Sequence, residues 1–146
     1  ELLRDLSSLL CLINLEWLSI TCLDPDPHNP FRGADVVCIS GLRQLETLHL
    51  GLNLVLVPPQ LGTLWHLRSF SVAGTGRVTL TLPEDLSRLT TLQDLRVSEP
   101  LWPDLPPLLY DLTGLRSLVV EGHHQYSHHL AMSSAVTKMT SLRHFG

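Results

Sequence analysis

The sequence is poor in aromatic residues and contains no long apolar run. Aromatic residues make up 5% of the 146 residues, although hydrophobic residues as a group make up 44%. Leucine supplies most of that apolar content. A core built mainly from one type of side chain indicates that the same small packing unit is repeated along the chain. The longest apolar candidate, residues 50–57, includes Asn53 and stops at two prolines. Because a membrane helix needs about 20 apolar residues, no membrane span is predicted.

Positive charge is also scarce. Lys138 is the one lysine, and the formal net charge is −4. A protein that binds nucleic acid through its phosphates needs a clustered basic surface. The composition therefore predicts no nucleic-acid partner.

Cysteine is too rare for a disulfide framework. Cys11, Cys22 and Cys38 form an odd set without paired spacing, and no Asn-x-Ser/Thr glycosylation site is present. Both observations favour a cytoplasmic or otherwise intracellular protein. The sequence starts without Met and stops within a repeat, so we expect residues 1–146 to be one segment of a longer protein.

A block of apolar residues recurs along the chain with spacings of three, three and two. Its second member stands at positions 15, 45, 67, 92, 115 and 142, which gives steps of 30, 22, 25, 23 and 27. The full copies are Leu12/Leu15/Leu18/Ile20, Leu42/Leu45/Leu48/Leu50, Leu64/Leu67/Phe70/Val72, Leu89/Leu92/Leu95/Val97 and Leu112/Leu115/Leu118/Val120, followed by the truncated Met139/Leu142/Phe145.

This block resembles the leucine-rich-repeat pattern L-x-x-L-x-L-x-x-N-x-L over essentially the whole chain. The fullest copy comprises Leu45, Leu48, Leu50, Asn53 and Val55. The resemblance implies an α/β solenoid of about five repeats plus a truncated sixth, with short parallel strands on a concave face and helical or 3-10 turns on the convex face. In a strand, the L-x-L step sends both leucines to one side, and stacking of repeats then covers them.

The segments between the blocks carry a second pattern. Residues 57–64, 82–89 and 105–112 share a proline followed by spaced leucines, and proline suits the first turn of a helix. This cadence resembles the intracellular repeats of plants and algae. The consensus asparagine is lost from the other copies, so irregular turns are expected. Residues 24–35 and 121–134 are predicted to be long loops.

The resemblance implies that a partner protein binds the concave face. The exposed strand positions that flank the buried leucines are the candidate binding residues, namely Trp17, Ser19, Thr47, His49, Ser69, Ser71, Asp94, Arg96, Glu99, Ser117, Val119, Glu121 and His144.

Two features of this face have alternative interpretations. Trp17 is either an interface anchor, as tryptophan often is, or a cover for an exposed end of the solenoid. The charged residues Asp94, Arg96, Glu99 and Glu121 either meet a basic partner or neutralise one another in a solvated surface.

The residue after each second leucine forms a column along one flank, acidic first and basic later. Glu46 and Arg68 are predicted to be neighbours there, in an exposed pair worth about 0–1 kcal/mol. The column is Glu16, Glu46, Arg68, Gln93, Arg116 and Arg143.

Catalytic and metal sites are weakly supported. His49, Ser71 and Asp94 share the face, but the serine strand lies between the other two, whereas a triad needs the order acid, histidine, serine. Residues 123–129 include His123, His124, His128 and His129, which fit zinc or copper only if the loop folds back. We predict a polar loop, no cofactor and no enzyme.

The leading hypothesis is a scaffold module for protein–protein interaction, or a structural subunit of a larger assembly. Solenoid ends without polar caps expose core leucines, so flanking sequence or neighbouring subunits are expected to cover them. The alternative is the recognition region of a ubiquitin-ligase adaptor or of a nucleotide-binding immune sensor.

Overall fold

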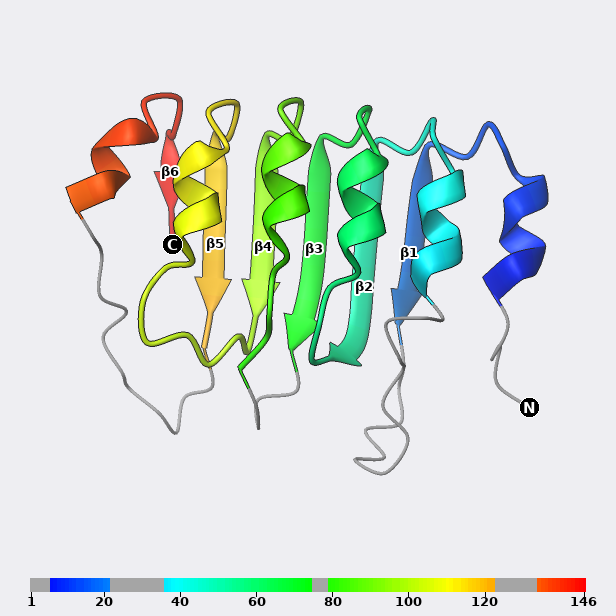
Figure 1. Ribbon diagram of the computed structural model, residues 1–146, viewed down its shortest axis with the longest axis horizontal. Coiled ribbons are helices and arrows are strands. Elements are labelled where there is room, and N and C mark those ends of the chain that lie inside the picture. The colour runs from blue at the N-terminus through cyan, green and yellow to red at the C-terminus, as the bar shows by residue number, and fades with distance from the viewer. Residues whose placement is uncertain (1–5, 22–35, 75–78, 123–133) are drawn as a thin grey trace.

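The computed structural model describes residues 6–21, 36–74, 79–122 and 134–146. Short 3-10 turns alternate along the chain with strands, and the two kinds of element form two layers (Figure 1). The elements are η1 (Leu6–Cys11), β1 (Trp17–Thr21), η2 (Cys38–Gly41), β2 (Thr47–Leu54), η3 (Pro59–Thr63), β3 (Ser69–Gly74), η4 (Glu84–Arg88), β4 (Asp94–Ser98), η5 (Pro107–Asp111), β5 (Ser117–Glu121), η6 (Ser134–Lys138) and β6 (His144–Phe145).

The strands form one parallel sheet in the order β1-β2-β3-β4-β5-β6, so each repeat pairs with the next along the chain. Equivalent residues stand side by side: Leu48 pairs with Phe70, Phe70 with Leu95, and Leu95 with Leu118. The fold is therefore the predicted leucine-rich-repeat solenoid. The six connecting elements η1 to η6 are 3-10 turns, and only Val36 and Val37, directly before η2, have α-helical backbone among the described residues.

The spacing of the leucines matches the hydrogen bonds of the 3-10 turns. A 3-10 turn joins each N–H to the carbonyl three residues earlier. The N–H of Leu64 donates to Leu61 O at 3.1 Å, and the N–H of Leu67 donates to Leu64 O at 2.9 Å. The same two steps recur at Leu89 and Leu92. The x-x-L spacing is thus the spacing of the backbone bonds that lead into each strand.

A doubly accepting carbonyl fixes the register of each new strand. Glu46 O accepts the N–H groups of Arg68 and Ser69, at 2.8 and 3.0 Å. Arg68 O in turn accepts those of Gln93 and Asp94, at 2.8 and 2.9 Å. At the other repeat boundaries, the carbonyl oxygens of Glu16, Gln93 and Arg116 likewise accept two backbone hydrogen bonds each.

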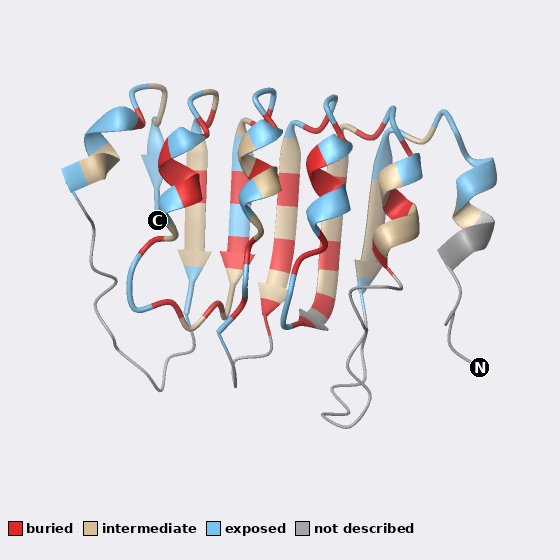
Figure 2. Ribbon diagram, in the orientation of Figure 1, coloured by how far each residue is buried: buried red, intermediate tan, exposed pale blue. Residues whose placement is uncertain are grey.

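The core lies between the strands and the turns. The predicted inward residues Leu48, Phe70, Leu95 and Leu118 are 0–3% exposed, and no polar or charged residue of the described chain is buried. Figure 2 shows burial concentrated in the central repeats and falling toward both ends. There Leu12 is 48% exposed, Ile13 is 65% exposed and Phe145 is 41% exposed.

The segments after the strands depart from the repeat pattern. Strand β2 continues past Leu50 and buries Leu52 and Leu54, and its register against β3 shifts between Leu50 and Leu54. Val55, which matches the last apolar position of the pattern, is 45% exposed. Irregularity is therefore present even in the copy that keeps Asn53, so loss of the asparagine is not its cause there.

Another irregular segment follows β4. Glu99 and Leu101 have positive φ values of 54° and 50°, a conformation that non-glycine residues rarely adopt. The indole N–H of the buried Trp102 donates to Leu80 O at 2.6 Å and ties this segment to the preceding repeat. The loop predicted at 24–35 and most of that predicted at 121–134 lie outside the described residues.

Candidate functional site

The strand face turned away from the 3-10 turns carries the predicted binding residues in rows across the strands. The sheet register places Thr47 beside Ser69, Ser69 beside Asp94, and Asp94 beside Ser117. Trp17 and His144 extend this upper row onto the end strands. A middle row runs Ser19, His49, Ser71, Arg96 and Val119, and a lower row includes Ala73, Ser98 and Glu121.

The central part of this face is hollowed into an open groove of about 530 Å³. Leu48, Phe70 and Leu95 also border the groove, but they alternate with its exposed residues along the strands, and their side chains are buried in the core on the other side of the sheet. Its polar lining is rich in hydroxyl groups and carries three charged residues. Of the predicted binding residues, the groove contains Thr47, His49, Ser69, Ser71, Asp94, Arg96, Ser117, Val119 and Glu121, and it adds Ser98.

The remaining predicted residues lie away from the groove. Trp17 is 62% exposed on the end strand β1, and Ser19 follows it there. His144 lies on the opposite end strand, β6. Glu99 follows β4 in a left-handed conformation, with its N–H donating to Glu121 O at 2.6 Å. The structure thus gathers the candidates of β2 to β5 and separates the other four.

The charges of the groove are partly paired. Arg96 Nε lies 3.8 Å from Glu121 Oε1, and Ser98 Oγ donates to Glu121 Oε2 at 3.1 Å. Within the described parts of the chain, the side chains of Asp94 and His49 have neither an ion pair nor a hydrogen bond. The self-neutralising interpretation therefore holds for Arg96 and Glu121 and fails for Asp94.

The arrangement of His49, Ser71 and Asp94 is not that of a hydrolytic triad. Ser71 pairs in register with His49 on one side and with Arg96 on the other. Asp94 stands in the row above, beside Ser69, with β3 between it and His49. A carboxylate that orients a catalytic imidazole must contact it, and this one is two strands away.

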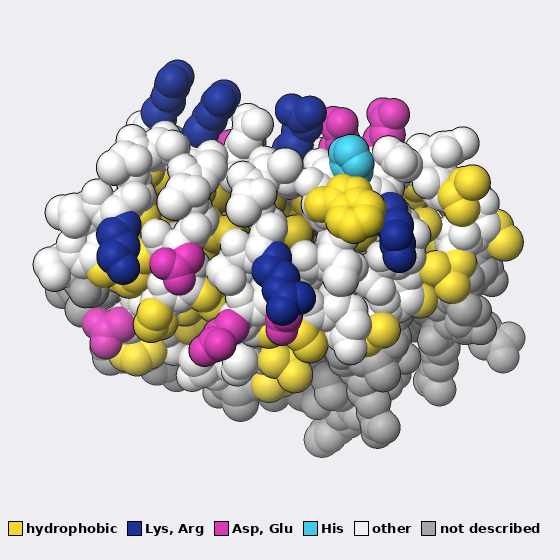
Figure 3. All heavy atoms as spheres, turned by 45° about the horizontal axis from the view of Figure 1, so that its top comes forward, with side chains coloured by type: hydrophobic (Ala, Val, Ile, Leu, Met, Phe, Trp, Pro, Cys, Tyr) yellow, Lys and Arg dark blue, Asp and Glu magenta, His cyan; other side chains and the backbone are white. Residues whose placement is uncertain are grey.

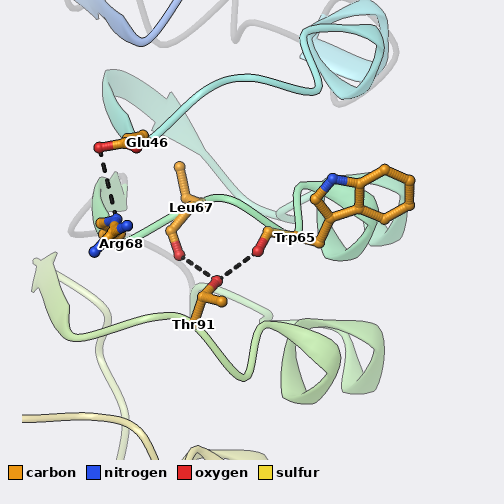
Figure 4. Close-up of polar contacts among 5 residues, drawn as sticks. All are labelled: Glu46, Trp65, Leu67, Arg68 and Thr91. Carbon is orange, nitrogen blue, oxygen red and sulfur yellow. Dashed lines mark hydrogen bonds and ion pairs between the residues drawn. The ribbon is translucent and has the colours of Figure 1, made fainter.

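The predicted charge column lies along the edge where the strands begin. Along the top of Figure 3, basic side chains project over the carboxyl-terminal strands and acidic ones over the amino-terminal strands. The neighbour relation predicted for Glu46 and Arg68 is confirmed, with 3.6 Å between Arg68 Nε and Glu46 Oε2 (Figure 4). Both side chains are about half exposed.

An aromatic cluster on the same edge was missed by the sequence analysis. Trp65 is 54% exposed, with the Arg43 guanidinium carbon 5.3 Å from its ring centroid and the His66 ring edge-on at 6.4 Å. Thr91 Oγ1 lies 2.7 Å from Trp65 O and 2.9 Å from Leu67 O, so the two carbonyls share its one hydroxyl proton (Figure 4). Arg43 and Trp65 each follow the first leucine of their block, Leu42 and Leu64, so they hold equivalent positions in consecutive repeats. This equivalence could have predicted that the two side chains are neighbours.

The polar loop predicted at residues 123–129, and the metal site that was its alternative, lie outside the described residues, so neither is tested. Residues 6–21, 36–74, 79–122 and 134–146 contain no cluster of three or more histidine, cysteine or acidic side chains that could bind a metal ion. The same residues contain no helix with the length and apolar character of a membrane span.

Comparison with known proteins defines the class by its fold. No family model matches the sequence, and no curated protein matches it. Among solved structures, a leucine-rich-repeat protein of Leptospira interrogans superposes with a TM-score of 0.66 at 19% identity, over 94% of this chain and 33% of that one. Internalin C2 of Listeria monocytogenes gives 0.67 at 18%, over 99% and 56%. A second Listeria internalin gives 0.55 at 17%, over 97% and 43%.

The chain therefore has the fold of the leucine-rich-repeat proteins. It spans 33–56% of the length of the solved chains to which it is similar.

Proposed function

We propose that this chain is a non-enzymatic protein-interaction module that binds a partner polypeptide on its strand face, in the groove of β2 to β5. The supporting observation is the groove itself, which combines exposed polar side chains with a floor formed by the paired backbone of four adjacent strands. A rigid surface with adaptable polar groups loses little conformational entropy on binding. The separation of His49 from Asp94 supports a binding function over hydrolysis.

Site-specific photo-crosslinking tests the location of the binding surface. A photoreactive amino acid replaces either Ser71, in the groove, or Thr113, which lies outside the groove between η5 and β5. Neither residue takes part in an ion pair. We expect a partner protein to be captured from Ser71 and not from Thr113. Ser71→Trp should fill the groove and weaken binding of the captured partner at least about tenfold, while Thr113→Trp leaves it unchanged. Equal effects from both sites would refute the groove as the binding surface.

We also propose that the ends of the solenoid are covered in the working protein by flanking sequence or neighbouring subunits. The exposure of Leu12, Ile13 and Phe145 supports this role in a larger assembly, because apolar patches of this kind favour association. The isolated chain should self-associate in light scattering, and Ile13→Asp combined with Leu12→Asp should reduce its apparent mass. Unchanged monomer mass for the unsubstituted chain at high concentration would contradict the proposal.

An intracellular setting and kinship with the plant and algal type of repeat are parts of the same proposal. The odd set of cysteines and the proline-leucine cadence support them. Partial trypsin digestion of cells, with antibody detection of the chain, distinguishes an intracellular pool from an exposed one.

A further inference from the structure

The charges of the groove are arranged along a diagonal from acid to base to acid. Asp94 stands in the upper row of β4, Arg96 two residues further along the same strand, and Glu121 in the lower row of β5. Residues two apart on a strand share a face and lie about 6.6 Å apart. Arg96 therefore separates the two carboxylates.

The arginine is engaged with one of the two acids. Its Nε lies 3.8 Å from Glu121 Oε1, and Ser98 contributes a further hydrogen bond to the same carboxylate. Asp94 is exposed and, in the described part of the chain, has no such partner. It stands in register between Ser69 and Ser117, so hydroxyl groups flank it on both neighbouring strands.

Nothing in the groove suits a polyanion. Its uncompensated charge is negative, and a carboxylate repels phosphates. Bases of single-stranded nucleic acids stack on exposed aromatic rings, whereas the groove is lined by no tryptophan or tyrosine, and its one phenylalanine, Phe70, is 1% exposed. Charge complementarity thus favours a basic ligand.

We infer that the groove binds an extended polypeptide segment that places one lysine or arginine against Asp94, with Ser69 and Ser117 as hydrogen-bond acceptors beside it. This inference rests on the proposed function. Arg96 neutralises the carboxylate of Glu121 through their ion pair, so Asp94 is the one groove carboxylate left to bind a basic side chain. Removal of Arg96 should free a second carboxylate and strengthen binding of a basic segment.

The test uses a phage-displayed library of random peptides, selected against the whole chain. Selected peptides should be enriched in lysine and arginine. For a chosen peptide, Asp94→Asn should weaken binding about three- to tenfold, and Arg96→Gln should strengthen it about two- to fivefold, since such charge pairs have modest but measurable energies.

Matched controls come from the layer of turns. Asp111→Asn removes an exposed acid from η5, and Arg88→Gln removes an arginine whose NH1 lies 3.3 Å from Asp85 Oδ1. Each control changes the net charge as the groove variant does, so a general electrostatic effect would appear in both. We expect no change in peptide affinity from either control.

The possible failures are distinguishable. Enrichment of acidic residues, absence of basic enrichment, tighter binding of a single-stranded oligonucleotide, or equal effects of Asp94→Asn and Asp111→Asn would overturn the inference. If Ser71→Trp still blocks peptide binding in those cases, the proposed groove survives. If Ser71→Trp leaves peptide binding unchanged while Thr113→Trp blocks it, the proposed function fails as well.

Discussion

Strands β1 and β3 carry the same alternation of side chains and differ in how deeply they are buried. In β3, Phe70 and Val72 are each 1% exposed. In β1, the equivalent Leu18 and Ile20 stand in register with the next strand but are only half buried. An interior repeat is covered on both sides and an end repeat on one, so the same sequence pattern yields different stabilisation at different places in the stack.

The largest expected effect comes from the core leucines. Leu95→Ala should lower the free energy of unfolding by about 2–5 kcal/mol, because a fully packed side chain leaves a cavity. Leu18→Ala removes the same atoms from a half-exposed site of β1 and should cost less than about 2 kcal/mol. Urea denaturation of both variants measures the difference. Equal losses would show that the end strand is packed as tightly as the interior.

Two glycines extend the comparison to the turns. A Cβ on Gly62 of η3 would collide with Asp85 O, a backbone atom of the next turn. A Cβ on Gly41 of η2 would lie 2.6 Å from Leu10 Cδ2, the tip of a side chain that is 43% exposed. Gly62→Ala should therefore destabilise by about 1–3 kcal/mol, and Gly41→Ala by less, since Leu10 can rotate away. Thermal melts of the two variants test this order, and a larger loss at Gly41 would contradict it.

A smaller effect is expected from the hydroxyl that links two interior repeats. Thr91→Val removes the single O–H donor that the carbonyls of Trp65 and Leu67 share, and should cost about 1 kcal/mol. Ser141 holds the equivalent position in the last repeat, and no described hydrogen bond involves its hydroxyl. Ser141→Ala should therefore be neutral in the same melts. A neutral Thr91→Val would show that water replaces this shared hydrogen bond without loss.

The smallest effect belongs to the exposed pair of Glu46 and Arg68. A double-mutant cycle with Glu46→Gln and Arg68→Gln should give a coupling energy of about 0–1 kcal/mol at low salt. The coupling should fall as ionic strength rises, because both side chains are about half exposed. A coupling that persists at 1 M salt would point to a buried interaction instead.

The sequence predicted the strands and their register because each depends on a local spacing. Two residues between leucines set the 3-10 hydrogen bonds, and one residue between Leu48 and Leu50 sets the inward face of β2. Both spacings recur in the six copies of the block, so each copy supported the register assigned to the others. The same register correctly placed the groove residues of β2 to β5 side by side.

The sequence could not predict the features that depend on contacts outside the repeat. The left-handed backbone at Glu99 and Leu101 belongs to a segment that is held by the hydrogen bond from Trp102 to Leu80 O. Trp102 occupies no position of the repeat pattern, so the pattern does not predict that bond. Exposure of Val55 follows from the shifted register after Leu50. Whether Arg96 pairs with Glu121 or with Asp94 is a choice between neighbouring rotamers, which spacing alone does not decide.

The doubly accepting carbonyls of Glu16, Glu46, Arg68, Gln93 and Arg116 give the molecule a mechanical direction. A force applied along the stack, from one repeat to the next, loads these junctions in series, so the weakest repeat detaches first and the others follow singly. A force applied along the strands loads neighbouring hydrogen bonds together in shear. A single-molecule pulling experiment should therefore record a low sawtooth in the first geometry and a higher rupture force in the second.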